Sequence, residues 1–189
     1  MPAIHVLITA LALLMGATHA SAQGETDAWE ALREGRAVLI LRHALAPGTG
    51  DPARFRLGDC STQRNLSDRG REQAAAWKPF LAQQGIHQAQ VYTSQWCRSR
   101  DTATEMDIGE VTEWPALNSF FQDRSQRSPQ TSETIALVNS LEPRPPVVMV
   151  SHQVNITALT GIFPASNEGL ILALPLSEPA EVLARVTPN

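Results

Sequence analysis

The stretch AVLILRHALAPG, residues 37–48, decides the fold of this chain. Its first five residues are an uninterrupted apolar run rich in branched side chains, which predicts a buried strand. The run stops at two cation-capable side chains, Arg42 and His43, and Pro47 and Gly48 then indicate a loop. A core strand that ends in this way is typical of the carboxyl edge of an α/β sheet, where ligands bind.

Strand-like and helix-like segments alternate along the rest of the chain. Further strands are predicted at AQVYTS (89–94), PPVVMVSH (145–152) and EGLILALPL (168–176), and an edge strand at EVTEWPALN (110–118), which Pro115 interrupts. Helices are predicted over residues 26–35, 65–85, 99–106 and 132–143. This order predicts an α/β fold, a three-layer sandwich in which helices flank a mostly parallel central sheet.

The first 22 residues have the pattern of a secretory signal peptide. The apolar run VLITALALLMGA is followed by Ala20-Ser21-Ala22, an A-x-A cleavage pattern, which predicts a mature domain of residues 23–189. No Lys or Arg precedes the run, so an uncleaved anchor is the alternative. No later segment is apolar enough to cross a membrane, and we expect export across the inner membrane to the periplasm.

The charge balance excludes one class of partner. The chain has a formal net charge of -4, so we expect no nucleic-acid partner, because duplex binding needs a basic surface. Arg supplies every basic residue except Lys78, and the planar guanidinium suits phosphate, although a GC-rich genome would produce the same bias. A small phosphorylated substrate is the expected partner, and the sequence predicts no particular oligomeric state.

The two cysteines, Cys60 and Cys97, both lie in the exported part. An even count in an oxidising compartment predicts a disulfide, which would stabilise the fold by roughly 3–4 kcal/mol in the chain-entropy model. The alternative is a reactive thiol or a metal ligand. It is the weaker reading, because neither cysteine has a second Cys or His within a few residues.

Three predicted strands end in groups that bind anions. The first runs into Arg42 and His43, the second is followed closely by Arg98, and the third ends at His152. Because the carboxyl ends of parallel strands meet at one edge of a sheet, we expect these four side chains to share a pocket. Two arginines, two histidines and the following helix N-termini suit a dianion such as phosphate.

The motifs for other chemistries are missing from the sequence. There is no Asp and His cluster with metal-ligand spacing, no GxxxxGK loop and no GxSxG elbow, so we expect no metal and no cofactor. Two imidazoles facing a phosphate leave a simple route, in which one His attacks phosphorus and water later hydrolyses the phosphohistidine. Nearby Arg charges keep the attacking imidazole unprotonated.

Four segments together resemble the signatures of the histidine phosphatase superfamily, whose fold is that of phosphoglycerate mutase. They occur in the family's order, at LRHA (41–44), LSDRGREQA (66–74), SQWCRSRDTA (94–103) and VVMVSH (147–152). The resemblance covers about residues 36–175 and is closest to small exported members of branch 1. It implies that His43 is the nucleophile, that Arg42 and Arg98 bind the phosphoryl group, and that His152 completes the pocket.

The resemblance also implies a backbone N–H donor at Gln153, but two positions depart from the family pattern. Ala44 stands where the family usually has Gly. Mutase-like members carry a Glu after a Leu-Asn pair, whereas Asn118 is followed here by Ser119, and the next carboxylate is Asp123. Asp123 is therefore the candidate general acid, with a solvated loop residue as the alternative. The missing Glu argues against mutase chemistry.

The sequence thus predicts an exported, metal-independent phosphatase that hydrolyses phosphomonoesters through a phosphohistidine at His43. A cell-envelope sugar phosphate, such as one in the lipopolysaccharide core, is the expected substrate, and Arg54 and Arg64 in the long loop of residues 46–64 are candidates to bind the rest of it. Two alternatives remain: a phospholigand-binding module that has lost turnover, and a phosphohistidine-protein phosphatase.

Overall fold

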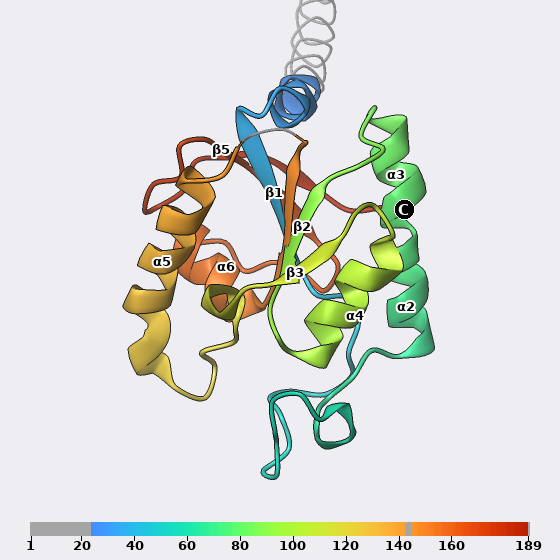
Figure 1. Cartoon of the computed structure of the whole chain (residues 1–189), viewed down its shortest axis with the longest axis vertical. Coiled ribbons are helices and arrows are strands. Elements are labelled where there is room, and N and C mark those ends of the chain that lie inside the picture. The colour runs from blue at the N-terminus through green and yellow to red at the C-terminus, as the bar shows by residue number, and fades with distance from the viewer. Residues whose placement is uncertain (1–23, 143–144, 189) are drawn as a thin grey trace, which may run out of the picture.

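A six-stranded sheet forms the centre of the molecule in a computed structural model, which describes residues 24–142 and 145–188. The signal peptide predicted at residues 1–22 lies outside the described residues. The order across the sheet is β3-β2-β4-β1-β5-β6 (Figure 1). The strands are β1 (Ala37–Arg42), β2 (Gln90–Thr93), β3 (Val111–Glu113), β4 (Val147–Ser151), β5 (Gly169–Ala173) and β6 (Val182–Val186).

Four neighbouring strands run parallel, which confirms the mostly parallel sheet predicted from the sequence. β3, β2, β4 and β1 are parallel, whereas β5 pairs antiparallel with β1 and β6 antiparallel with β5. The prediction ended with the strand that became β5 and missed β6. β6 lies at the sheet edge and most of its residues are only partly buried, so its sequence lacks the strong apolar signal of the central strands.

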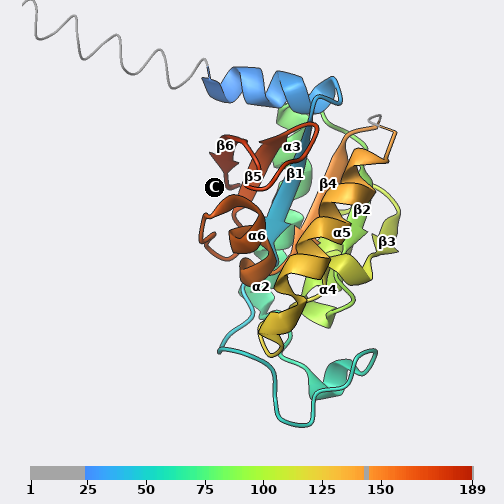
Figure 2. The ribbon, with the colours of Figure 1, turned by 90° about the vertical axis from the view of Figure 1, so that its left-hand side faces the viewer.

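Helices cover both faces of the sheet (Figures 1 and 2). Leu39 and Leu41 of β1 pack with Trp77 in one core, and Val38 and Ile40 pack on the opposite side. Three helices contribute to the first core: the helix of residues 24–33, α3 (Trp77–Gln83) and α4 (Cys97–Met106), with α2 (Asp68–Ala75) lying beside α4. Two helices contribute to the second core: α5 (Arg127–Asn139) and α6 (Gln153–Thr160). The three-layer sandwich is therefore as predicted. No helix among the described residues is long and apolar enough to cross a membrane.

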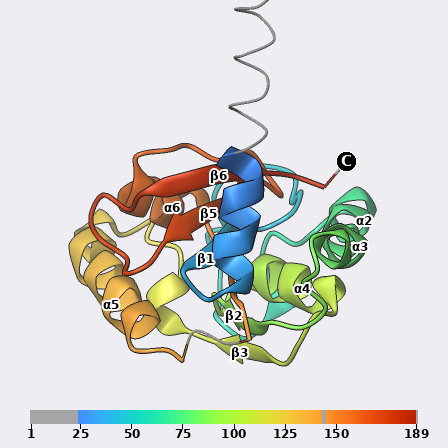
Figure 3. The same ribbon diagram turned by 90° about the horizontal axis from the view of Figure 1, so that it is seen from above.

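Two helices differ from the sequence prediction. The single helix expected over residues 65–85 is divided into α2 and α3 at Ala76, because Pro79 has no N–H to donate to the carbonyl of Ala75 four residues earlier. The helix expected from Ser132 begins five residues earlier, at Arg127, directly after the 3-10 turn η3 (Arg124–Gln126). In Figure 3 the opposite placement of α5 and α3 on either side of the sheet is visible from above.

A disulfide joins the long loop to the start of α4. Cys60, in the 3-10 turn η1 (Cys60–Thr62), is bonded to Cys97, the first residue of α4, with their Cα atoms 5.7 Å apart. This bond confirms the predicted disulfide. Since the loop of residues 46–64 extends beyond the carboxyl ends of the strands (Figure 2), the cross-link restricts it next to the predicted phosphate-binding Arg98.

The segment after His43 lies directly against α2. Ser67 caps α2 by accepting a hydrogen bond from the N–H of Gly70, and the N–H of Ser67 donates to the carbonyl of Leu45 at 3.1 Å. A Cβ atom on Gly70 would lie 2.2 Å from the oxygen of Leu45. Only glycine therefore allows this close approach, which fixes the chain just beyond His43.

Replacing Gly70 with Ala tests this packing. We expect Gly70→Ala to lower the free energy of unfolding by about 1–3 kcal/mol, because the added methyl group must displace backbone rather than a flexible side chain. Gly24→Ala is the matched control, since an added Cβ there meets no atom within 4 Å. Denaturant unfolding of both variants measures the difference, and equal stability of the two would contradict the close approach.

Candidate active site

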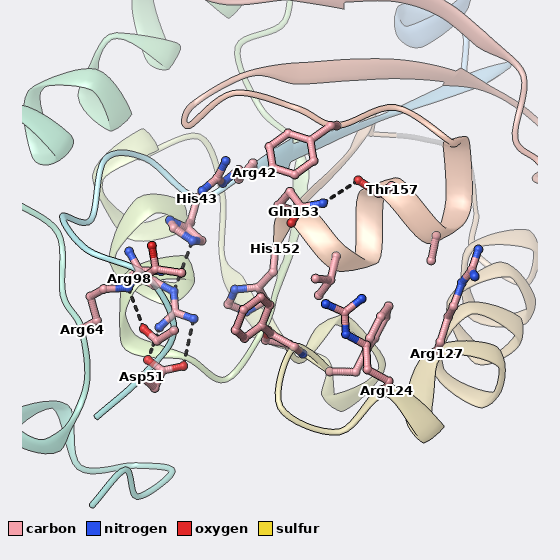
Figure 4. A pocket seen from close by; sticks show the side chains of 18 of the residues that line it. Arg42, His43, Asp51, Arg64, Arg98, Arg124, Arg127, His152, Gln153 and Thr157 are labelled. Carbon is pink, nitrogen blue, oxygen red and sulfur yellow. Dashed lines mark hydrogen bonds and ion pairs between the residues drawn. The ribbon is translucent and has the colours of Figure 1, made fainter. Parts of the chain in front are cut away.

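The carboxyl ends of β1, β2 and β4 meet at one pocket of about 580 Å³ (Figure 4). Four side chains predicted from the strand ends line it together: Arg42, His43, Arg98 and His152. The register explains the meeting, because Arg42 at the end of β1 pairs with Ser151 at the end of β4. The pocket therefore collects residues that are more than 50 positions apart in the sequence.

The ring of His43 is held in one orientation and one tautomer. The side chain is 2% exposed, and its Nδ1 lies 2.8 Å from the carbonyl oxygen of Ala44. On the other side, Nε2 lies 3.2 Å from Nε of Arg98, which donates. A carbonyl can only accept and a guanidinium can only donate, so Nδ1 carries the proton and Nε2 carries the lone pair.

The surroundings of His43 keep it neutral. Burial, followed by the positive charge of Arg98, holds the pKa of the imidazole well below its usual value of 6.5. The carbonyl of Ala44 opposes this effect but does not outweigh it. His43 is therefore unprotonated at neutral pH, which is the state a nucleophile or an acceptor requires.

The second histidine lies beside the first. The ring centroids of His43 and His152 are 5.4 Å apart, and Nε2 of His152 lies 2.8 Å from Oγ of Ser94. Its Nδ1 is buried and has no hydrogen-bond partner among the described residues. Burial, then Arg98 and His43, also holds the pKa of His152 well below its usual value. Buried polar atoms are normally hydrogen-bonded, so this Nδ1 of His152, close to the neutral ring of His43, indicates a place for a polar ligand.

Asp51 forms a buried ion pair with Arg98, which sequence reasoning missed. The two carboxylate oxygens lie 2.5 and 3.1 Å from the two terminal nitrogens of Arg98, and Trp96 Nε1 donates to the same carboxylate at 2.9 Å. Burial alone would raise the pKa of Asp51, but its bonds with Arg98 and Trp96 hold it below the usual value. The only local signal is that Asp51 follows two glycines with positive φ, Gly48 and Gly50.

The other two arginines at this end of the pocket bind backbone carbonyls. Arg42 donates to the carbonyl of Pro164 at 3.1 Å, and its buried Nε has no partner among the described residues. Arg64 donates to the carbonyls of Gly50 and Ala46, and burial together with Arg98 lowers its pKa to about 10. Arg64 therefore lies in the pocket, as expected for a substrate contact, and also fixes the loop that carries Asp51.

Gln153 is brought to the pocket, whereas two other predicted residues are not. Gln153 is the first residue of α6 and lines the pocket, with its side-chain amide donating to Thr157. Arg54 is exposed and lies outside the pocket lining. Asp123 also lies outside it: its carboxylate caps η3 by accepting from Ser125, and these bonds lower its pKa. The structure thus gives the carboxylate of Asp123 a capping role and places it outside the pocket lining, where the solvated loop residue was the alternative.

Ala44 fits where the family pattern has glycine. Its methyl group is fully buried among Ala46, Leu66 and Ala74, and its N–H donates to Oγ1 of Thr102 at 3.0 Å. Trp96 and Trp114 have different surroundings. Trp114 stacks on Tyr92, while Trp96 holds Asp51 and stacks on Phe55.

The site is arranged for an oxyanion and a nitrogen nucleophile. It holds a neutral imidazole with a directed lone pair, a second imidazole and several guanidinium groups within one cavity. No group of three or more His, Cys, Asp or Glu side chains within residues 24–142 and 145–188 could hold a metal ion. Such a set of groups can bind a tetrahedral phosphoryl group and attack it.

Known proteins share both the sequence pattern and the fold. Residues 38–126 match the family model described as histidine phosphatase superfamily (branch 1). The protein histidine phosphatase SixA complexed with tungstate is 19% identical, with 80% of this chain and 97% of that chain covered and a TM-score of 0.54. The putative phosphohistidine phosphatase SixA from Agrobacterium tumefaciens is 16% identical, with coverages of 82% and 99% and a TM-score of 0.55.

A third structure of this fold is the mycobacterial glucosyl-3-phosphoglycerate phosphatase with inorganic phosphate. It is 17% identical, with 82% of this chain and 97% of that chain covered and a TM-score of 0.54. No curated protein sequence matches the chain. At these identities the structural likeness establishes the fold and its arrangement of strands.

The two neutral histidines predict how stability depends on pH. In the unfolded chain both imidazoles titrate near their usual pKa of 6.5, whereas the folded pKa values lie well below it. Below pH 6.5 the unfolded state thus binds more protons, and stability falls as pH falls, by at most about 2.7 kcal/mol per pH unit for two groups. We expect this loss in phosphate-free denaturant titrations between pH 7 and pH 5.

The double variant His43→Gln/His152→Gln should remove most of that pH dependence. Replacing the exposed His87 with Gln should leave it in place. If the wild-type protein and the double variant lose stability equally between pH 7 and pH 5, the two histidines are not held neutral.

Proposed function

We propose, because the chain belongs to the histidine phosphatase superfamily, that it hydrolyses phosphomonoesters through a phosphohistidine intermediate at His43. One observation carries this proposal: Nε2 of the neutral His43 has its lone pair toward Arg98 at 3.2 Å, inside a pocket that also holds Arg42 and His152. A nucleophile and the cations for the transition state are thus in contact before substrate binds.

In the first step Nε2 of His43 attacks phosphorus, so that an N–P bond forms as the bond to the ester oxygen breaks. Arg42 and Arg98 bind the equatorial oxygens, where negative charge is spread in the transition state. The imidazole becomes positively charged, and its Nδ1–H remains hydrogen-bonded to the carbonyl of Ala44. The leaving oxygen takes up a proton and departs as an alcohol.

Asp51 is the proposed donor of that proton. It is the one carboxyl group among the described residues that line the pocket. In the free protein its charge is paired with Arg98. A bound phosphoryl group competes for the same guanidinium, and two anions side by side favour a shared proton, which raises the pKa of the carboxyl group.

In the second step water attacks phosphorus and the N–P bond breaks. The carboxylate of Asp51 takes a proton from the water, and inorganic phosphate leaves with His43 again neutral. Water and not a bound alcohol accepts the phosphoryl group, which separates hydrolysis from mutase chemistry.

An exported location and a cell-envelope sugar phosphate complete the proposal. The A-x-A pattern at residues 20–22 supports export, and the Cys60–Cys97 disulfide supports an oxidising compartment such as the periplasm. One structural neighbour, the mycobacterial glucosyl-3-phosphoglycerate phosphatase, is named for a sugar-containing phosphomonoester. A phosphorylated sugar of the envelope is the member of this class that an exported enzyme meets.

Trapping the intermediate tests the nucleophile. The mature protein, incubated with a labelled phosphomonoester and quenched, should yield an acid-labile, base-stable phosphoprotein. His43→Ala should yield none and should lower the hydrolysis of p-nitrophenyl phosphate by about 10³-fold or more, because the covalent route is lost. His87→Ala, an exposed histidine outside the pocket, is the matched control and should behave as the wild-type protein does.

The same experiment separates the two alternatives. A wild-type protein that binds phosphate but forms no phosphoprotein, and hydrolyses no faster than His43→Ala, is a phospholigand-binding module. A chain that hydrolyses phosphohistidine in another protein but hydrolyses no sugar phosphate is instead a phosphohistidine-protein phosphatase.

The role of Asp51 is tested by the leaving group. We expect Asp51→Asn to slow hydrolysis of ethyl phosphate by about 10²-fold or more, because an alkoxide needs a proton, and to slow p-nitrophenyl phosphate far less. Asp123→Asn removes the same charge from the capped, exposed carboxylate and should change neither rate. Equal losses on both substrates in Asp51→Asn would leave Asp51 as a partner that positions Arg98 and not a proton donor.

A further inference from the structure

The pocket extends well beyond the groups that the phosphoryl transfer uses. Its inner half holds His43, Asp51, Arg98 and their neighbours, whereas its outer half is formed by the segment after Asn118 and by α6 with the loop that follows. The outer half is lined by Ser119, Phe121, Arg124, Arg127, Thr157 and Phe163. In Figure 4 His152 lies between Asp51 and the arginines of the outer half. This outer half lies where the leaving group of a bound phosphate ester would extend.

Two arginines of the outer half have no acidic partner. Neither Arg124 nor Arg127 forms an ion pair with a carboxylate of the described residues, and both line the pocket. The nearest acidic neighbour in sequence, Asp123, is used by the cap at Ser125. The pocket lining holds five arginines and one aspartate although the chain carries a net charge of -4. Positive charge is thus concentrated beyond what one phosphoryl group requires.

Two exposed aromatic rings line the same pocket as these arginines. Phe163 is 67% exposed and Phe121 is 42% exposed, and both line the pocket. The guanidinium of Arg124 lies 5.6 Å from the centre of the Phe121 ring, a cation–π contact that holds the arginine at the pocket wall. Exposed aromatic side chains that gather at a cavity are typical of a binding surface.

We propose that the outer half binds a leaving group that is a sugar carrying a second anionic group, a phosphate or a carboxylate. Arg124 and Arg127 bind the second anion, while the rings of Phe121 and Phe163 contact the apolar face of the sugar. Hydroxyl groups of the sugar meet polar side chains of the same wall, Ser119 and Thr157. The proposal rests on the proposed phosphatase function and names the substrate class of that site.

Two pairs of substrates test the second anion. The wild-type protein should prefer 4-carboxyphenyl phosphate over phenyl phosphate, and glucose 1,6-bisphosphate over glucose 6-phosphate. We expect about a tenfold or greater preference in kcat/KM, as one charge-assisted hydrogen bond provides. In Arg124→Gln/Arg127→Gln the preference should fall close to one for both pairs of substrates.

Arg54→Gln is the matched control for charge. Arg54 is an exposed arginine outside the pocket, so its loss should leave the preference unchanged. The proposal is overturned if the wild-type protein shows no preference for the doubly anionic substrates, or if the preference survives in Arg124→Gln/Arg127→Gln. It is also overturned if Arg54→Gln abolishes the preference equally, since the net charge of the chain would then explain it.

A third comparison tests the aromatic rings. The wild-type protein should have a lower KM for glucose 1,6-bisphosphate than for the ringless propane-1,3-diol bisphosphate, and Phe163→Ala should abolish this difference. Leu57→Ala is the control, because Leu57 is 48% exposed and lies outside the pocket lining. A KM difference that persists in Phe163→Ala would remove Phe163 from sugar recognition.

Binding measurements keep this proposal separate from the proposed function. Calorimetric titration of His43→Asn with glucose 1,6-bisphosphate and glucose 6-phosphate measures the anion preference without turnover. If the wild-type protein forms no phosphoprotein, the proposed phosphatase function is wrong. The two affinities would still test whether the subsite prefers a second anion. If turnover is normal but glucose 1,6-bisphosphate and glucose 6-phosphate bind with equal affinity, only the subsite proposal is wrong.

Discussion

The contact between Arg98 and Asp51 is the interaction on which the site depends. Through Nε, Arg98 donates to Nε2 of His43, the proposed nucleophile, and through its terminal nitrogens it binds a buried carboxylate from a distant loop. A guanidinium buried without its partner would be strongly unfavourable, so the ion pair fixes the loop as firmly as it fixes the arginine. The same charge, after burial, is the leading reason that both histidines stay neutral.

The loop of residues 46–64 is held for this purpose by several independent contacts. The Cys60–Cys97 disulfide, the stacking of Phe55 on Trp96, and the bonds of Arg64 to the loop backbone all act within reach of Asp51. The close approach of Gly70 to Leu45 fixes the chain just after His43, where this loop begins. A long loop therefore behaves as part of the rigid site, which is the preorganisation that electrostatic catalysis requires.

The remaining part of the pocket suggests how one fold serves different substrates. The inner half comes from strand ends and helix starts, which the sheet positions. The outer half comes from the connection that carries Arg124 and from the loop that carries Phe163, and such segments vary without disturbing the core. In the proposed function, chemistry and substrate choice thus belong to different parts of the pocket, which meet at His152.

The α/β class, the parallel strands and the four groups at the strand ends could all be predicted from the sequence, because they depend on apolar runs and on the rule that parallel strands share a carboxyl edge. The sequence also predicted the disulfide, from the cysteine count and the expected compartment. Only the tertiary structure decided that Asp51, and not Asp123, lies in the pocket, since loop carboxylates look alike in sequence and their partners are far away in it. For the same reason no local pattern encodes the tautomer of His43, or the lack of an ion pair between Arg124 and the carboxylates of residues 24–142 and 145–188.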